Sequence, residues 1–123
     1  MAFDWQEFLK LAKFLRTYRG REFMEEAGLR TAVGRAYYAA FCPSREYARQ
    51  NFDYSPGHTP KDHIDVRNCF QRRGDRWVRV ATNLDQLRKW RNLCDYEAEI
   101  HNNLSVWVQK ALRCAEEVLI EVS

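Results

Sequence analysis

The segment Leu84–Glu97, LDQLRKWRNLCDYE, is decisive for the fold because it puts a permanent cation on the apolar face of a predicted helix. It contains no glycine or proline and is rich in helix-favouring residues. Its apolar face extends in both directions at steps of three and four residues: Trp77, Val80, Leu84, Leu87, Arg91, Cys94 and Ala98. The Arg91 guanidinium cannot lose its charge, so it must meet a carboxylate, a phosphate or a water-filled groove. Asp95, one turn later, is the nearest carboxylate.

On both sides of this segment, helix-capping residues, glycines and prolines predict four or five helices joined by short loops. The expected ranges are about Asp4 to Tyr18, Phe23 to Gln50, Thr59 to Gly74 and Asp75 to Ile100, with a fifth helix capped by Asn102 or Asn103. Asp4 with Glu7 matches a variant of the capping box, and Thr59 before a proline is a favoured start. We expect Gly20 to end the first helix and Pro43 to kink the second near residues 39–43. The segment NFDYSPGHT is the one long loop.

Helical spacing also predicts which residues of the other helices face the core. The expected faces are Trp5, Phe8, Leu11, Ala12, Leu15 and Tyr18 in the first helix; Val33, Ala36, Tyr37, Ala40 and Phe41 in the second; and Leu104, Trp107, Val108, Ala111, Ala115, Val118 and Val122 in the last. Small residues in the second helix allow close contact with its neighbours. Helices of this kind, with short connections, pack as an up-and-down bundle.

Composition supports one all-α domain spanning residues 1–123. The chain is 46% hydrophobic, with four Trp, six Tyr and seven Phe, which suits a packed globule. Five Gly and three Pro are too few for an all-β chain, which needs frequent turn signals. The net charge of +3 neither demands nor excludes a polyanionic partner.

Four cysteines, Cys42, Cys69, Cys94 and Cys114, are widely spaced, without a CxxC pair. Metal sites and disulfide frameworks space cysteines more tightly, so reduced thiols in a cytoplasmic protein are expected. No secretory signal stands at the amino terminus, and no apolar run approaches the length of a membrane span. We therefore predict a soluble protein without a membrane partner.

The fourth predicted helix offers a candidate polar site in Arg91, Asn92, Asp95 and Tyr96. Arg91 and Asp95 share one face, and Asn92 and Tyr96 share a neighbouring one. Arginine can grip a phosphate in a bidentate manner, asparagine can orient a sugar hydroxyl or phosphate oxygen, and tyrosine can stack on a base. The alternative is structural, with Arg91 and Asp95 paired to fix helix packing.

The second helix contributes a second candidate cluster in RTAVGRAYYAAF. Arg35 and Tyr38 lie beside its apolar stripe and can line the same groove as Arg91. In the alternative interpretation, the tyrosines are core aromatics with hydrated hydroxyl groups.

His58, His63 and His101 lack metal-ligand spacing with cysteine or with one another, so solvated or capping roles are the default. His58 and His63 flank the start of the third predicted helix, and His101 stands at the end of the fourth. There is no glycine-rich phosphate loop or nucleophile elbow. We expect no metal and no cofactor.

RTAVGRAYYAAF and LDQLRKWRNLCDYE, on the second and fourth helices of a small all-α domain, resemble the prokaryotic HEPN superfamily. The resemblance implies a compact bundle, frequent homodimerisation and a groove where the arginine motifs of two protomers meet. Many such domains are metal-independent endoribonucleases, often toxins in toxin-antitoxin or defence systems, encoded beside a nucleotidyltransferase that neutralises them. Their active motif is Arg, usually Asn, then three to five residues and a His.

Arg91 and Asn92 match this motif, but Tyr96 stands where the shortest spacing would put the histidine. A phenol with a pKa of about 10 is a poor general base at pH 7, whereas imidazole at about 6.5 is well suited. His101 lies too far along the helix for the usual geometry. The expected function is an RNA- or nucleotide-binding module, a dimeric partner in a two-component system, without the full ribonuclease chemistry. The alternatives are a weak metal-independent endoribonuclease using Arg91, Asn92 and Tyr96 or Asp95, and a purely structural dimer module.

Overall fold

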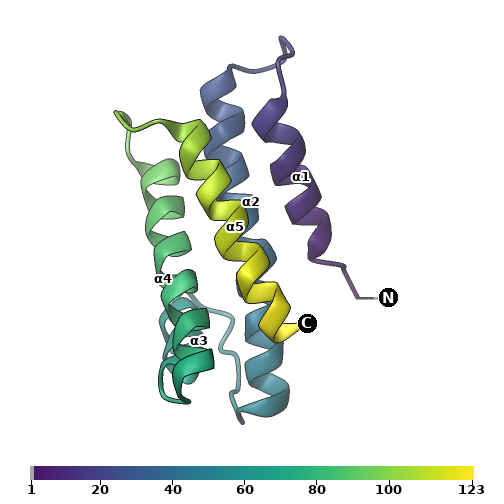
Figure 1. The fold of residues 1–123 in the computed structure, drawn as a ribbon, viewed down its shortest axis with the longest axis vertical. Helices are drawn as coiled ribbons and strands as arrows, with labels where there is room; N and C mark the ends of the chain where they lie inside the picture. The colour runs from purple at the N-terminus through teal and green to yellow at the C-terminus, as the bar shows by residue number, and fades with distance from the viewer. Residues whose placement is uncertain (1) are drawn as a thin grey trace.

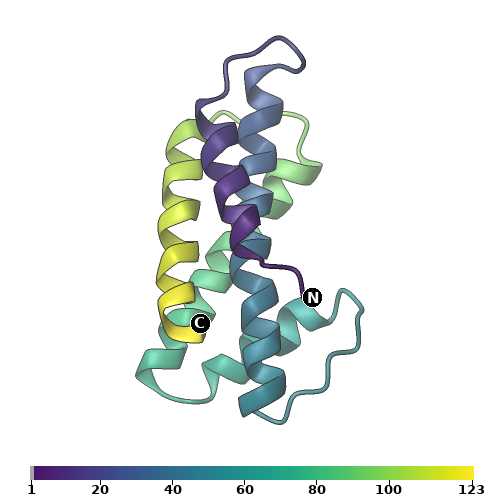
Figure 2. The same ribbon diagram turned by 90° about the vertical axis from the view of Figure 1, so that its right-hand side faces the viewer.

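A computed structural model describes residues 2–123 as a bundle of five helices, which confirms the predicted all-α class. The helices are α1 (Gln6–Thr17), α2 (Glu25–Asn51), α3 (Asp62–Gln71), α4 (Asp75–Tyr96) and α5 (Leu104–Val122). The long α2 packs against all four other helices, with α1 and α4 on opposite sides of it (Figure 1). The loop after α2 swings out from the lower end of the bundle before it reaches α3 (Figure 2).

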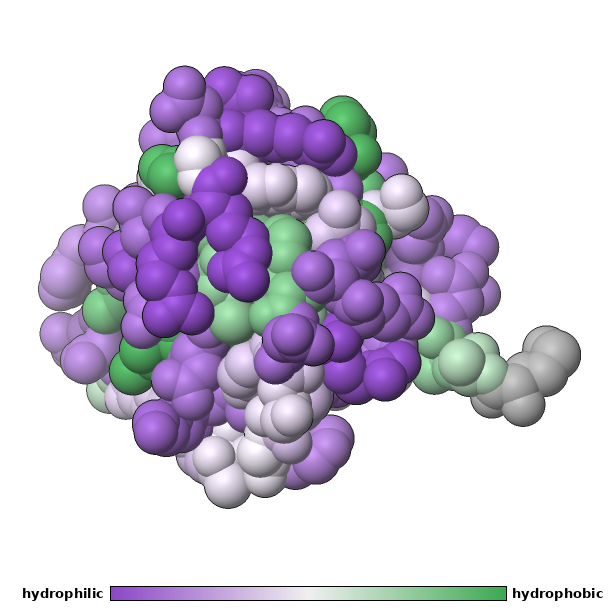
Figure 3. Space-filling view, turned by 90° about the horizontal axis from the view of Figure 1, so that it is seen from below, coloured by the Kyte–Doolittle hydropathy of each residue, from purple (hydrophilic) through white to green (hydrophobic). Residues whose placement is uncertain are grey.

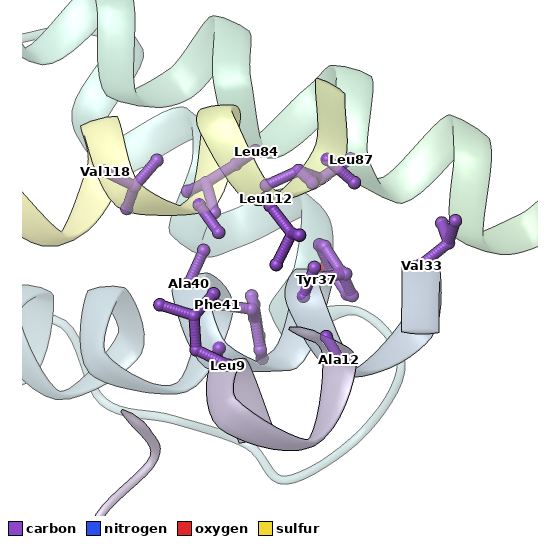
Figure 4. Close-up of a cluster of buried hydrophobic side chains, with 14 of the residues drawn as sticks. Leu9, Ala12, Val33, Tyr37, Ala40, Phe41, Leu84, Leu87, Leu112 and Val118 are labelled. Carbon is purple, nitrogen blue, oxygen red and sulfur yellow. The ribbon is translucent and has the colours of Figure 1, made fainter. Parts of the chain in front are cut away.

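The core lies between α2, α4 and α5 and is closed on one side by α1 (Figure 4). The predicted α2 residues Val33, Ala36, Tyr37, Ala40 and Phe41 are all buried. At the lower end of the molecule, hydrophilic residues surround a small apolar centre (Figure 3). The apolar faces predicted for α2, α4 and α5 therefore pack against one another in a single core.

The predicted face of α1 is wrong in one position. Leu11 is 41% exposed, whereas Leu9, which was not predicted, is buried at 8%. The Asp4 carboxylate does accept the Gln6 N–H at 3.0 Å. Glu7 pairs instead with Lys10 at 3.5 Å, and no reciprocal capping-box bond to Asp4 forms within residues 2–123. The helix ends at Thr17, three residues before Gly20.

The α2 helix begins at Glu25 rather than Phe23 and continues through Pro43 to Asn51. Beside the proline, the Ser44 hydroxyl donates to the Ala40 carbonyl at 2.8 Å. On the face toward α4, a Cβ added to Gly34 would lie 4.0 Å from Cγ of Arg91. The small residues of α2 thus allow the aliphatic stem of Arg91 to approach the helix backbone.

The start of α3 was predicted too early, because Thr59 and Pro60 precede the helix and the cap at Lys61 has no side-chain bond. Asp62 instead organises this turn. Its carboxylate accepts the backbone N–H groups of Gly57 and His58, both at 2.9 Å, and the hydroxyl of Tyr54. The helix ends at Gln71, and Gly74, with φ of 98°, adopts the left-handed conformation that glycine favours just before α4.

The end of α4 at Tyr96, rather than at Ile100, is set by a contact with α2. The Arg30 guanidinium donates to three carbonyls at this end: Cys94 at 3.1 Å, Glu97 at 2.5 Å and Ala98 at 3.2 Å. The last carbonyls of a helix lack partners in the helix itself, and a cation there also favours the helix dipole. Consequently Ala98 lies outside the predicted stripe, and His101 is not on the helix. In contrast, the predicted cap of α5 is confirmed, since Asn103 accepts the N–H groups of Ser105 and Val106.

Candidate functional site

A cavity of about 540 Å³ lies between α2, α3, α4 and the loop that precedes α3. Its lining is rich in cationic and aromatic side chains and contains one carboxylate. It comprises Tyr38, Phe41, Cys42, Arg45, His58, Thr59, Pro60, Asp62, His63, Arg88, Arg91, Asn92 and Tyr96. Four of the six predicted site residues, Tyr38, Arg91, Asn92 and Tyr96, line this single cavity.

Arg91 and Asp95 form the predicted ion pair, with Nε of Arg91 3.0 Å from Oδ2 of Asp95. Nη1 of Arg91 also donates to the side-chain oxygen of Asn92 at 3.1 Å. The guanidinium carbon lies 5.5 Å from the ring centroid of Tyr38 and 5.9 Å from that of Tyr96. The Arg91 side chain is only 17% exposed, so these contacts fix the guanidinium at the cavity wall. Asp95 supports Arg91 without lining the cavity itself.

Two further arginines in the cavity have no carboxylate partner among residues 2–123. Arg45 and Arg88 form neither an ion pair nor a hydrogen bond there, although Arg45 lies over the ring of Phe41 at 5.6 Å. The only carboxylate in the lining, Asp62, is engaged by Tyr54 and by two backbone N–H groups. Burial opposes ionisation of Asp62, but these hydrogen bonds hold its pKa below the ordinary value. The cavity is therefore strongly cationic.

Besides Arg45 and Arg88, the predicted site lacked His63 of α3, which lines the cavity as well. Its Nδ1 shares a hydrogen bond with the hydroxyl of Tyr37, and its ring stacks on Phe41 with centroids 4.5 Å apart. Burial lowers the pKa of His63 below the ordinary value, and the neighbouring charges of Arg91 and Arg88 lower it further. A neutral imidazole thus stands beside the arginines at pH 7. No spacing rule could find it, because α3 brings it to α4 only through tertiary packing.

Arg35 lies outside this cavity, although it was predicted to share a groove with Arg91. Its guanidinium carbon lies 4.5 Å above the ring of Phe8 in α1 and 5.3 Å from the ring of Tyr38. The aromatic face of α1 attracts the cation away from α4. The phenol of Tyr37, in contrast, is buried, and burial raises its pKa well above the ordinary value.

The other titratable groups give no sign of a metal centre. Within residues 2–123, no group of three or more His, Cys, Asp and Glu side chains is arranged to hold a metal ion. All four cysteines are free, and burial raises the pKa of Cys94 to about 11. His101 is exposed and lies 3.7 Å from Glu99. No helix within the described residues has the length and apolar content needed to cross a bilayer.

Comparison with known proteins finds a similar protein that is itself uncharacterised. A protein of Methanocaldococcus jannaschii is 29% identical over 113 residues, an alignment that covers 80% of this chain and 63% of that protein. The chain thus spans less than two thirds of the length of this relative. No family model and no solved structure matches the chain.

Proposed function

We propose that this protein is a HEPN-type RNA- or nucleotide-binding module whose cavity holds a phosphate group. The observation that carries the proposal is the convergence of Arg45, Arg88 and Arg91 on one cavity, two of them without a carboxylate partner. Unpaired guanidinium groups gathered in a concave, partly buried site repel one another, so an anion that bridges them is strongly favoured. A phosphate suits this site because arginine donates to it in a planar, bidentate geometry.

The uncharged residues of the cavity suit the rest of such a ligand. Asn92 accepts from Arg91 through its oxygen, which leaves its amide N–H groups to meet a sugar hydroxyl or a phosphate oxygen. Tyr38 and the 74% exposed Tyr96 offer aromatic faces for a neighbouring base of an RNA strand. This arrangement supports binding without requiring an acid or a base from the motif.

The proposal extends to a homodimer formed around α4 and to a nucleotidyltransferase-type protein as the second component. Leu93 and Tyr96 of α4 are exposed, at 40% and 74%, beside the arginine motif. Apolar and aromatic surface of this kind is typical of the centre of an interface. Light scattering at tens of micromolar tests the dimer, which a monomer at that concentration would contradict.

Binding is tested with a single-stranded RNA oligonucleotide and four variants. Arg88→Ala and Arg91→Ala should each weaken binding at least tenfold, whereas Arg113→Ala, which removes an exposed unpaired arginine of α5, should not. Arg91→Lys should recover little affinity because lysine lacks the planar fork. Affinity should fall as salt rises, since phosphate contacts release counterions. Unchanged affinity in Arg91→Ala together with a large loss of thermal stability would show that Arg91 is structural.

A second candidate function, metal-independent RNA cleavage, is favoured by the position of His63. In the tautomer whose Nδ1–H donates to Tyr37, Nε2 is free to accept the proton of a ribose 2′-hydroxyl. The 2′-oxygen would attack the phosphorus while Arg91 stabilises the developing charge, and the bond to the 5′-oxygen would break. The imidazolium would then return its proton to the departing 5′-oxygen.

Incubation of structured RNA with the protein in EDTA separates the two functions. If the module only binds, the RNA stays intact. If it cleaves, the product carries a 2′,3′-cyclic phosphate, and His63→Ala abolishes the reaction while RNA binding persists. Cleavage that survives in His63→Ala and disappears in Tyr96→Phe would instead assign the base to Tyr96.

A further inference from the structure

A second, smaller cavity of about 240 Å³ adjoins the arginine cavity between α3 and α4. Both cavities are lined by His63 and Arg88, so the two spaces are neighbours. The two cavities differ in the residues that line them. The smaller cavity is lined by the apolar Leu84 and Ile64, by the polar Asn68 and Asp85, and by Arg67 and Arg88.

Asp85 supplies the one carboxylate in the lining of the smaller cavity. Its carboxylate lies 3.9 Å from Nε of Arg67 and 3.7 Å from Nζ of Lys89. These are ion-pair distances, but they are too long for hydrogen bonds. Nε of Arg67 is itself buried without a hydrogen-bond partner, so Arg67 and Asp85 are not joined by a hydrogen bond. The Asp85 side chain is 32% exposed and accepts no hydrogen bond from any residue in 2–123. Its oxygens are therefore available to N–H donors of a ligand.

Asn68 supplies the complementary donors. Its side-chain oxygen accepts Nη1 of Arg67 at 3.1 Å, an arrangement that leaves both amide N–H groups without a protein acceptor. A carboxylate and an amide donor beside the apolar side chains of Leu84 and Ile64 fit a flat group with polar edges. The dimensions agree, since a cavity this small takes a fragment rather than a whole drug-sized ligand.

We propose that this cavity is a nucleobase subsite that favours guanine, with the phosphate of the same nucleotide bound in the arginine cavity. Guanine presents two adjacent N–H donors, at N1 and at its amino group, which match the two oxygens of Asp85. Uracil presents one N–H between two carbonyl oxygens, and those oxygens would face the carboxylate unfavourably. The inference rests on the proposed phosphate site and names the ligand class that this site takes.

Calorimetric titration with three ligands tests the subsite separately from the phosphate site. Ribose 5-phosphate probes the arginine cavity alone, while guanosine and uridine 5′-monophosphates add a base. Wild type should bind the guanine nucleotide at least tenfold more tightly than either other ligand. Asp85→Asn should abolish that preference and leave the affinity for ribose 5-phosphate unchanged.

Arg91→Ala is the matched control, because it should weaken all three ligands by a similar factor. Equal affinity of wild type for all three ligands, with Arg91→Ala still weakening them, would overturn the base subsite and leave the phosphate site standing. Failure of every ligand to bind would overturn both. Circular dichroism of Asp85→Asn checks the fold, and Asp85→Ala, if folded, should lose the same preference.

Discussion

Replacing Arg30 with methionine tests whether a single residue of α2 sets the end of α4. Methionine keeps much of the aliphatic volume but removes the donors to the carbonyls of Cys94, Glu97 and Ala98. The Arg30 side chain is 18% exposed and also contacts Glu26, one turn earlier in α2, at 2.9 Å. The substitution therefore removes the cap of α4 together with the ion pair to Glu26, and a partly exposed pair of this kind contributes little to stability.

The magnitude follows from the exposure of the three acceptors. A partly buried hydrogen bond from a charged donor, here to Cys94, contributes about 1.5 to 3 kcal/mol. Water can replace the donors at Glu97 and Ala98, which are exposed, so these two bonds contribute roughly 0.5 kcal/mol each. The expected loss is about 3 kcal/mol, which corresponds to a fall in Tm of about 10 °C for a domain of this size.

Urea denaturation and thermal melts followed by circular dichroism measure this loss. Arg113→Met is the matched control, since Arg113 is exposed on α5 and makes no ion pair or hydrogen bond within residues 2–123. Amide hydrogen exchange should accelerate at residues 94–98 in Arg30→Met alone. If Arg30→Met and Arg113→Met both stay within about 0.5 kcal/mol of wild type, the range of ordinary surface substitutions, the capping argument is refuted.

Three further predictions concern the core, the pH dependence of stability and the motif. Leu87→Asp should unfold the protein, because an unpaired carboxylate at a fully buried position costs several kcal/mol against a total of about 5 to 15 kcal/mol, whereas Leu93→Asp at 40% exposure should fold. The free energy of unfolding in urea should rise between pH 5 and 7, because the pKa of His63 is lowered in the folded state and the unfolded chain therefore binds the proton more readily. His63→Asn should reduce this dependence of stability on pH, and an unchanged dependence would contradict the lowered pKa of His63. Tyr96→His should raise metal-independent RNA cleavage by about 10²- to 10⁴-fold, the usual contribution of a placed general base. Tyr96→Phe should leave RNA binding nearly unchanged, since stacking needs the ring alone, so a large loss of affinity would implicate the hydroxyl.

The sequence predicted helix features correctly where they depend on residues within one or two turns of each other. Asn103 caps α5 as predicted because the cap bonds only the next turn of the same chain. The stripe of α4 buries Val80, Leu84, Leu87 and Cys94, since spacing fixes which residues share a face. The ion pair of Arg91 and Asp95 was predictable for the same reason, because residues four apart on a helix are neighbours.

The errors occur where a side-chain contact that helical periodicity does not describe competes with the capping or spacing signal. Thr59 and Pro60 read as a helix start, but the Asp62 carboxylate draws the preceding backbone into a turn. Arg35 has the right spacing for a shared groove, but Phe8 of α1 attracts its guanidinium. Neither competing contact leaves a periodic trace in the sequence.

The all-α class, the apolar faces of the helices and the group of Arg91, Asn92, Asp95 and Tyr96 could be predicted from the chain alone, because all of these depend on separations of three or four residues. The tertiary structure decided where α4 ends, through Arg30, and what faces Arg91 across the cavity. It brought His63 from α3 and Arg45 from α2 to the arginine of α4, and so changed an isolated motif into a cationic cavity with a neutral imidazole. Contacts between helices depend on packing of whole faces, and no local pattern specifies which single side chains then meet.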